Sequence, residues 1–381
     1  MPADLLFPAD MWTLSSPDDI FSPQLLVFRE HLEHNLRLIM EMAGPHATQR
    51  LRPHCKTHKM PAIIKRQLAL GITRHKAATF AEAEMLAQSG VRDIVLGYNL
   101  VGPNIRRAVR FVHTYPEVDF SVTVDAVSPA EALSNAMVTA DSTIGVLVDI
   151  NPGRDRTGLP AGEDAQKLYQ HICDLPGLRP NGLHVYDGHF HQSDLAERLA
   201  AVEPEWQKVL QLRDSLEASG CPVPRLICGG TPTFPVYSQF DDPALELSPG
   251  TCVFHDVGYH TKYPDLQKFR PAAVVLTRVI SRPTADRLTL DMGTKSVASD
   301  PPMGQRAWLP ALPDAEQVLH NEEHLVLVTP QASDFQPGDW LIAIPRHVCP
   351  TSALHREAVV IENGEAVDRW PVTARDRQIT I

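Results

Sequence analysis

The sequence predicts an α/β protein, a (β/α)8 barrel followed by a second, mostly β C-terminal domain. From about residue 25 to about residue 255, short apolar segments alternate with longer segments of helical periodicity. After about residue 258 the helical segments stop, and apolar runs separated by turn residues follow. With 381 residues, the chain is also too long for one compact core of ordinary size.

Eight apolar segments in the first part are expected to form the barrel strands. They are residues 51–56, 75–80, 93–98, 120–125, 143–150, 182–188, 225–230 and 244–249. Several are almost entirely apolar, as parallel strands buried on both faces should be. Helical patterns lie between them, for example at 81–90 and 194–220. The first pattern ends on Gly90 and the second on Gly220, which are typical helix stops.

The second part reads as strands and turns. The apolar runs are residues 272–283, 287–293, 324–330, 339–348 and 357–372. Within the last of them, Asn363 and Gly364 form a hairpin signal. We therefore expect a barrel domain over 22–258 and a β domain over 259–381, with residues 1–21 joined to the β domain.

Composition limits the classes of function. The net charge of −11 argues against a nucleic-acid-binding surface. No run of about 18 apolar residues predicts a membrane span, and the N-terminus lacks the pattern of a signal peptide. The six cysteines are widely spaced and form no CxxC pair. This usage favours the reducing cytoplasm over a disulfide framework.

The segment "RPHCKTHK", residues 52–59, concentrates cationic and nucleophilic side chains. In a regular strand His54 and Lys56 would share one face, and Lys59 would lie on the other. The C-terminal ends of barrel strands open onto the active site. A partly desolvated lysine there, near other cations, would have a lowered pKa and could form a Schiff base. The alternative is a solvated basic strand end that binds an anion or nothing.

Two further segments carry candidate ligands. "ICGGTPTFP", residues 227–235, follows an expected strand, and its glycines and hydroxyls suit an anion. The alternative for this segment is a tight turn without a ligand. "IPRHVCPTSAL", residues 344–354, lies on an expected strand, which would place His347 and Cys349 on one face. An imidazole and a thiolate side by side favour Zn²⁺, with Mn²⁺ or Mg²⁺ as alternatives.

"RPHCKTHK" resembles the pyridoxal-phosphate lysine motif of the D-threonine aldolase and D-serine dehydratase family. These proteins are relatives of the alanine racemase N-terminal domain and belong to fold type III. The resemblance extends from about residue 22 to about residue 376. It implies that Lys56 carries pyridoxal 5′-phosphate. It also implies that the glycine-rich turn, with Gly229, Gly230 and Thr231, holds the cofactor phosphate.

Two more segments resemble cofactor-binding elements of this family. "NPGRDRTGL", residues 151–159, is similar to its strand-end "RTG" element, which implies that Arg156 faces the cofactor. "HVYDGHF", residues 184–190, is similar to a strand that ends in a tyrosine at the pyridine ring, which implies this role for Tyr186. The alternatives are a surface arginine and a tyrosine of the barrel core.

The segment around His347 resembles the family's "P-x-H-x-C/D-P-T" element, which binds a divalent metal beside the cofactor. The aldolases carry aspartate at the third ligand position of this element and the D-serine dehydratases carry cysteine. Cys349 therefore departs from the aldolase pattern. This departure leaves the metal and the reaction outcome open.

The resemblance implies a lyase that depends on pyridoxal phosphate and a divalent metal and acts on D-β-hydroxy-α-amino acids. Retro-aldol cleavage to glycine and an aldehyde is the favoured reaction. The first alternative is β-elimination, as in a D-serine or D-threo-3-hydroxyaspartate dehydratase, giving a 2-oxo acid and ammonia. The second alternative is an amino-acid racemase, which needs no such metal pair. The resemblance also implies a homodimer.

Overall fold

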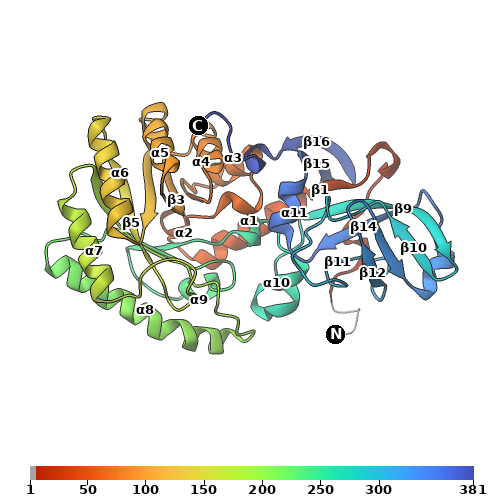
Figure 1. Cartoon of the computed structure of the whole chain (residues 1–381). Helices are drawn as coiled ribbons and strands as arrows, with labels where there is room; N and C mark the ends of the chain where they lie inside the picture. Colours follow the sequence, from red (N-terminus) through yellow and green to blue (C-terminus); the bar gives the residue numbers. More distant parts are fainter. Residues whose placement is uncertain (1–5) are drawn as a thin grey trace. The chain divides into compact units, whose positions relative to one another are not determined.

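The structure is a computed structural model that describes residues 6–381. It divides into two compact units (Figure 1). The barrel unit consists of Met40–Lys56, Pro61–Gly250 and Asp376–Ile381. The β unit consists of the described residues up to Ile39, together with Thr57–Met60 and Thr251–Arg375. This division differs from the expected ranges 22–258 and 259–381, because a strand that starts at Gln24 pairs within the β unit.

The barrel unit contains seven parallel strands whose order in the sheet follows the chain. They are β2 (Arg74–Ala77), β3 (Asp93–Asn99), β4 (Asp119–Val124), β5 (Ile144–Ile150), β6 (Leu178–Val185), β7 (Leu226–Cys228) and β8 (Leu245–Leu247). Their buried faces are rich in Val, Ile and Leu, as expected for strands covered on both sides. The predicted parallel α/β architecture is confirmed.

The segment before β2 completes the ring of strands without being a regular strand. Leu51 forms a parallel bridge with Leu247 of β8, and His54 forms one with Lys76 of β2. Pro53 has no N–H to donate and supplies only its carbonyl, which accepts from the Lys76 N–H at 3.0 Å. The chain then turns into a 3-10 helix over Cys55–Thr57. The predicted strand over 51–56 is therefore wrong, and so is the argument that His54 and Lys56 share a strand face.

Helices cover the outside of the parallel sheet (Figure 1). They are α2 (Ala47–Arg50), α3 (Pro61–Ala69), α4 (Phe80–Gln88), α5 (Pro103–Thr114), α6 (Val127–Thr139), α7 (Glu163–Asp174), α8 (Leu195–Ala218) and α9 (Phe234–Tyr237). The Thr79 side chain caps α4 by accepting from the Glu82 N–H, and Asp194 caps α8 in the same way. Gly90 and Gly220 follow these helices with φ of +99° and +83°, which confirms the predicted stops.

The β unit is built around one nine-stranded sheet. Its strands are β1 (Gln24–Phe28), β9 (Ala273–Thr284), β10 (Arg287–Leu290), β11 (Ala307–Trp308), β12 (Glu316–His320), β13 (Leu325–Val328), β14 (Trp340–Pro345), β15 (Glu357–Glu362) and β16 (Glu365–Pro371). Helix α1 (Arg29–Ala43) follows β1, and α10 (Val257–Lys262) and α11 (Val348–Leu354) lie in the later sequence. The predicted hairpin is confirmed, since Asn363 and Gly364 join β15 to β16 with positive φ.

Two features of the described chain bear on its class. Among residues 6–381, no helix has the length and apolar character that a membrane crossing requires. None of the six cysteines, all of which lie in the described part of the chain, forms a disulfide. The cysteines therefore contribute to packing and chemistry rather than to cross-links.

Candidate active site

Lys56 lies in the 3-10 helix that follows the irregular barrel segment, and its side chain is half-buried. Its backbone N–H donates to His54 Nδ1 at 3.3 Å, which fixes the start of the turn. The lysine Nζ lies 5.7 Å from the centroid of the Tyr186 ring. The second lysine of the motif, Lys59, belongs to the β unit. It has a positive φ of 55°, and its carbonyl accepts from the Ala374 N–H of the same unit.

Tyr186 follows the last residue of β6 and brings two predicted site residues together. The guanidinium carbon of Arg156 lies 4.5 Å from the Tyr186 ring centroid, within the range of a cation–π contact. Arg156 itself is exposed in the loop after β5. Lys56, Arg156 and Tyr186 therefore form one cluster at the C-terminal ends of the parallel strands, where barrels build active sites.

The glycine-rich turn after β7 lies next to the same tyrosine. A Cβ on Gly230 would meet the Tyr186 ring at 3.2 Å, and Gly229 has a φ of +74° that favours glycine. The Gly229 N–H donates to the Val185 carbonyl, and the Gly230 N–H donates to Thr233 Oγ1 at 3.1 Å. The two glycines thus allow the close approach to Tyr186, while their N–H groups have partners within the protein. A phosphate contact by these glycines and Thr231 stays a prediction.

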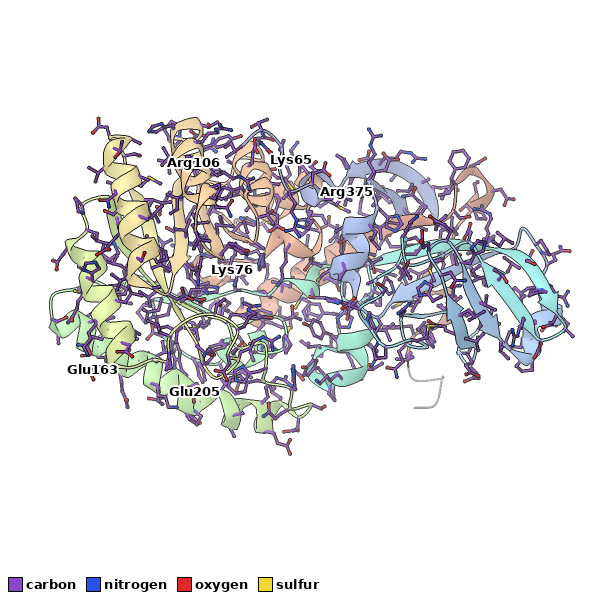
Figure 2. All side chains as sticks on the ribbon, viewed as in Figure 1. Lys65, Lys76, Arg106, Glu163, Glu205 and Arg375 are labelled. Carbon is purple, nitrogen blue, oxygen red and sulfur yellow. The ribbon has the colours of Figure 1, made fainter. Side chains whose placement is uncertain are left out.

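A buried polar group below this cluster was missed by the sequence analysis. Lys76 of β2 is 3% exposed, and its Nζ lies 3.4 Å from His184 Nε2. His184 Nδ1 lies 2.7 Å from the Asp149 carboxylate. Figure 2 shows Lys76 among the strands, whereas Arg106, Glu163 and Glu205 lie on the outer helices. The sequence held one indication of this group, because Lys76 lies in the segment 75–80, which was expected to be a buried strand.

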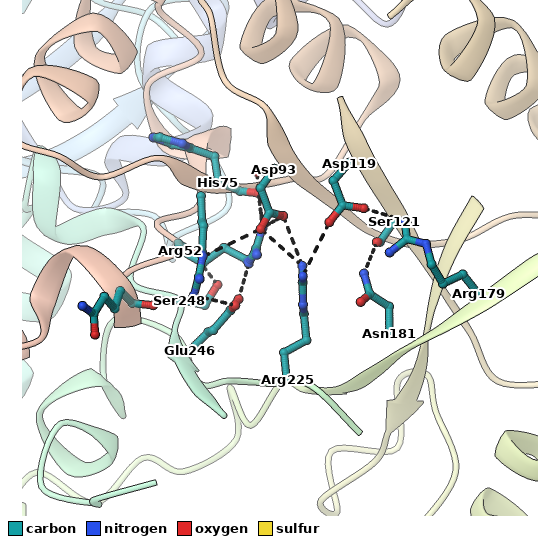
Figure 3. A network of polar contacts seen from close by, with 12 residues as sticks. Arg52, His75, Asp93, Asp119, Ser121, Arg179, Asn181, Arg225, Glu246 and Ser248 are labelled. Atoms are coloured by element: carbon teal, nitrogen blue, oxygen red, sulfur yellow. Dashed lines mark hydrogen bonds and ion pairs between the residues drawn. The ribbon is translucent and has the colours of Figure 1, made fainter. Parts of the chain in front are cut away.

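The strands begin at an ionic network at the opposite end of the barrel (Figure 3). The Arg52 side chain is fully buried and pairs with Glu246 and with Asp93, the latter at 2.9 Å. Arg225 reaches both Asp93 and Asp119, at 3.1 and 3.5 Å. Burial alone would raise the pKa of Asp93, yet Arg52 and its neighbours hold it below the ordinary value. These charges are paired, so we assign them to stability.

The predicted metal residues lie in the β unit. His347 is the N-cap of α11 and Cys349 lies in its first turn, so the predicted strand at this position is wrong. The helix nevertheless brings the imidazole and the thiol into contact. Burial alone would raise the pKa of the Cys349 thiol, but the interaction with His347 lowers it below the ordinary value. A lowered thiol pKa favours the thiolate, which is the form that binds metals.

Asp300 orients the histidine of this pair and was missed as a site residue. Its carboxylate lies 2.5 Å from His347 Nδ1 and accepts the proton of that nitrogen, so Nε2 is the ring nitrogen that would coordinate a metal. Burial alone would lower the pKa of His347, but Cys349 and Asp300 raise it to about 9. Cys349 Sγ also lies 3.2 Å from the hydroxyl of Thr57 and 3.4 Å from that of Thr251. In the sequence, Thr57 is the residue that follows Lys56.

A second group of metal-type side chains has a structural explanation. Ligand atoms of His54, Cys55 and Glu82 lie within 4.8 Å of one another. However, the Glu82 carboxylate accepts from the Ala78 N–H at 2.6 Å, while the Glu82 N–H donates to Thr79. The two hydrogen bonds fix the start of α4 in the manner of a capping box, with the donor Ala78 one residue before the N-cap Thr79. Cys55 Sγ lies 3.7 Å from the same carboxylate, so we assign the group to helix capping.

Comparisons with known proteins agree with this arrangement. Residues 27–256 match the family described as alanine racemase, N-terminal domain, and residues 272–361 match a serine dehydratase domain. The D-threonine aldolase of Arthrobacter sp is 31% identical over 93% of this chain and 92% of that protein. The 3-hydroxy-D-aspartate aldolase of Paracoccus denitrificans (strain Pd 1222) is 27% identical over 94% of this chain and 93% of its own length.

A solved structure extends the likeness to three dimensions. The crystal structure of D-threonine aldolase from Filomicrobium marinum superposes with a TM-score of 0.85 at 28% identity. The match covers 97% of this chain and 99% of that one. The chain therefore belongs to the D-threonine aldolase and D-serine dehydratase-like family of fold type III pyridoxal-phosphate enzymes, which share the alanine racemase N-terminal domain.

Proposed function

We propose that this protein is a pyridoxal-phosphate- and divalent-metal-dependent lyase that cleaves D-β-hydroxy-α-amino acids into glycine and an aldehyde. The observation that carries the proposal is the Asp300–His347–Cys349 group, an oriented imidazole beside a thiol, in a chain that also has the family's lysine motif. A racemase, which moves only the α-proton, has no use for this group.

The residues of the barrel unit fit the cofactor. Lys56 offers a half-buried primary amine that would hold the cofactor aldehyde covalently. Tyr186 and Arg156 would contact the pyridine ring, and Gly229, Gly230 and Thr231 would line the phosphate. When bound, the cofactor supplies an electron sink for the carbanion that forms at the α-carbon.

The residues of the β unit fit a divalent cation. His347 Nε2 and the Cys349 thiolate are a nitrogen and a sulfur donor, which favours Zn²⁺ over Mg²⁺, a cation that prefers oxygen ligands. Mn²⁺ is the alternative. Two protein donors leave positions open for substrate. The cation supplies Lewis acidity toward the β-hydroxyl, and Asp300 keeps His347 in the tautomer that can act as a ligand.

Dehydration is a second candidate, and Cys349 is the observation that favours it. The resemblance associates cysteine at this position with the dehydratases and aspartate with the aldolases. In this alternative Lys56 removes the α-proton and the β-hydroxyl leaves. The products are then a 2-oxo acid and ammonia rather than glycine and an aldehyde.

A product assay separates the two reactions. Purified holoenzyme is incubated with D-threonine, D-serine and D-3-hydroxyaspartate, and glycine is measured against ammonia and 2-oxo acid. We expect glycine without ammonia from D-threonine or D-3-hydroxyaspartate. Ammonia with 2-oxo acid, and no glycine, would replace the aldolase assignment with the dehydratase.

Metal removal and matched variants test the cation site. Treatment with a chelator should abolish turnover, and Zn²⁺ or Mn²⁺ should restore it. His347→Ala and Asp300→Asn should weaken metal binding, the latter by about 10–100-fold because the supporting hydrogen bond is lost. Cys349→Asp, which restores the aldolase pattern, should retain a metal and shift its preference toward Mn²⁺. Unchanged metal affinity in both His347→Ala and Cys349→Ala would remove these residues from the site.

We also propose a homodimer in the cytoplasm. The resemblance implies the dimer, and six cysteines without a disulfide suit a reducing compartment. Sedimentation of the holoenzyme at micromolar concentration should give twice the chain mass of 42.2 kDa. A monomer at these concentrations would remove the dimer from the proposal.

A further inference from the structure

The barrel unit holds a second amine whose burial needs an explanation. Lys76 is the third residue of β2, and a parallel bridge pairs it with His54, two residues before Lys56. Its side chain is 3% exposed, although lysine is almost never buried without a partner. No salt bridge to Lys76 occurs among the ion pairs of the described residues. Its close polar neighbour is an imidazole, at 3.4 Å.

The hydrogen bonds around this imidazole define what Lys76 does. Asp149 accepts from His184 Nδ1 at 2.7 Å, so Nε2 carries a lone pair. That lone pair can accept an N–H from Lys76 whether the amine is neutral or charged. Burial lowers the pKa of His184, so the imidazole stays neutral. The hydrogen bonds then run one way: Lys76 donates to His184, and His184 donates to Asp149. Neither Asp149 nor His184 is more than 5% exposed.

Space for this line is provided by a glycine of β3. A Cβ on Gly97 would lie 3.5 Å from both His184 Nε2 and Lys76 Cδ. Since β3 presents no side chain here, the lysine and the histidine meet directly across it. Strands β2, β5 and β6 therefore supply the three side chains, and Gly97 of β3 leaves the space in which they meet.

The charges that face Lys76 come from every neighbouring element. They are Lys56 and Arg52 in the segment before β2, Asp149 on β5, His184 on β6, Asp187 after β6 and Cys228 on β7. Burial, and after it the charge of Lys56, lower the pKa of Lys76 from 10.5 to about 7. Asp149 raises it by a smaller amount, and its charge is already engaged by His184.

We propose that Lys76 is a positioning residue of the cofactor site, a second amine that is neutral in the working enzyme, orients His184 and limits positive charge around Lys56. The inference rests on the proposed function, because it needs Lys56 to hold the cofactor. A cationic Lys76 would disfavour a positive nitrogen on Lys56 through like-charge repulsion. A neutral Lys76 keeps the hydrogen bond to His184 without this repulsion.

A pair of variants fixes the two charge states. Lys76→Met is neutral at every pH, whereas Lys76→Arg is always cationic. Lys208→Met, at an exposed lysine of α8 that pairs with Glu205 on the same helix, is the control. The visible absorbance of each holoenzyme is titrated between pH 6 and pH 10. We expect the midpoint of Lys76→Arg to lie ~1 pH unit or more below that of Lys76→Met, with wild type close to Lys76→Met. Coinciding midpoints, or a wild type that matches Lys76→Arg, would overturn the proposal.

The apoprotein gives a second measurement that needs no cofactor. In the unfolded chain Lys76 holds its proton up to about pH 10.5, and in the folded chain only up to about pH 7. Between these values the unfolded state binds one more proton, so stability rises with pH. The melting temperature of Lys76→Met relative to wild type should therefore be higher at pH 7.5 than at pH 10. If the difference in melting temperature between Lys76→Met and wild type does not vary with pH, Lys76 is charged in the folded protein and the proposal is rejected. This result decides the question even if no absorbance band of the holoenzyme titrates.

Lys56→Ala separates a failure of this inference from a failure of the proposed function. If Lys56→Ala loses the lysine-bound absorbance and Lys76→Met keeps it, the cofactor is on Lys56 and the two titrations above decide the role of Lys76. If Lys76→Met loses the absorbance and Lys56→Ala keeps it, the cofactor is on Lys76, and both the lysine assignment and this inference are rejected.

Discussion

The two ends of the parallel strands handle positive charge in opposite ways. Where the strands begin, Arg52 and Arg225 are matched by Asp93, Asp119 and Glu246 in a closed network (Figure 3). Where they finish, Lys56 and Arg156 lie against the ring of Tyr186, and no carboxylate pairs with them among the ion pairs of residues 6–381.

The contrast matches the two roles we assign, stability at the start of the strands and cofactor binding at their C-terminal ends. Charges that are paired in a network stabilise a specific closure of the barrel, and their pairing leaves them little reactivity. Amines and guanidinium groups without carboxylate partners are poor for stability and suited to an anionic, electrophilic cofactor. Substitutions should therefore separate stability from activity according to the end at which they are made.

The largest effect is expected from Lys56→Ala. Removal of the amine that holds the cofactor should lower kcat/KM by about four orders of magnitude. The melting temperature of the apoprotein should change little, because the side chain is half-buried and forms no ion pair with a carboxylate of residues 6–381. Steady-state kinetics and thermal melts measure the two quantities. A large loss of apoprotein stability would show that the two ends are not separate in function.

Arg52→Met should have the reverse effect. The Arg52 guanidinium is fully buried and pairs with both Asp93 and Glu246. Its loss leaves these carboxylates with only the partly exposed Arg225 and Arg74 as partners. We expect a loss of about 3–5 kcal/mol in the free energy of unfolding, measured by urea denaturation. Arg179→Met is the matched control, since its ion pair with Asp119 is exposed and should cost at most about 1 kcal/mol. Equal losses in both variants would contradict the assignment of the network to stability.

Asp93→Asn should have a smaller effect that depends on pH. The folded pKa of Asp93 is depressed, so its charge contributes stability above the ordinary value near 3.8, and this stability is lost as pH falls through the folded pKa. The stability difference between wild type and Asp93→Asn should be largest near neutral pH and should shrink in acid. Urea denaturation at several pH values tests this, and a difference that grows in acid would reverse the sign of the argument.

The smallest effect is expected from Gly230→Ala. The new methyl group would lie 3.2 Å from the Tyr186 ring, so the ring must move by a few tenths of an ångström. We expect cofactor affinity to fall by about five-fold, close to 1 kcal/mol. Gly162→Ala is the control, because a Cβ there meets nothing within 4 Å and φ is extended. Fluorescence titration of the apoprotein with pyridoxal phosphate measures both. Equal affinity in the two variants would show that Tyr186 does not set cofactor binding.

Much of the architecture could be predicted because it depends on local patterns. Apolar runs separated by helical periodicity give the parallel strands, and Gly90, Gly220 and the Asn363–Gly364 pair mark helix stops and a hairpin. The prediction that side chains alternate between the two faces of a regular strand was wrong at the site itself. Pro53 interrupts the ladder before Lys56, and His347 and Cys349 lie at a helix start rather than on a strand. In each case a turn replaces the strand and brings the side chains together by another geometry.

The residues that were missed owe their roles to partners distant in sequence. Asp300 is 47 residues from His347, and Lys76 is 108 residues from His184. No spacing rule connects such pairs, and an aspartate or lysine alone has no special pattern. Residue type can also point to a metal where the fold uses it otherwise: Glu82 has metal-type neighbours, but its carboxylate accepts from the Ala78 N–H at the start of α4.

The sequence by itself determined the family, the strand and helix content, and the chemical inventory of lysine, histidine and cysteine motifs, because these depend on residue type and on separations of a few positions. The tertiary structure decided which charges are paired and which are not. Packing of the strands gives Arg52 two carboxylates and leaves Lys76 buried against a neutral imidazole. The energy of a charge depends on what surrounds it in space, and that surrounding is assembled only when the chain folds.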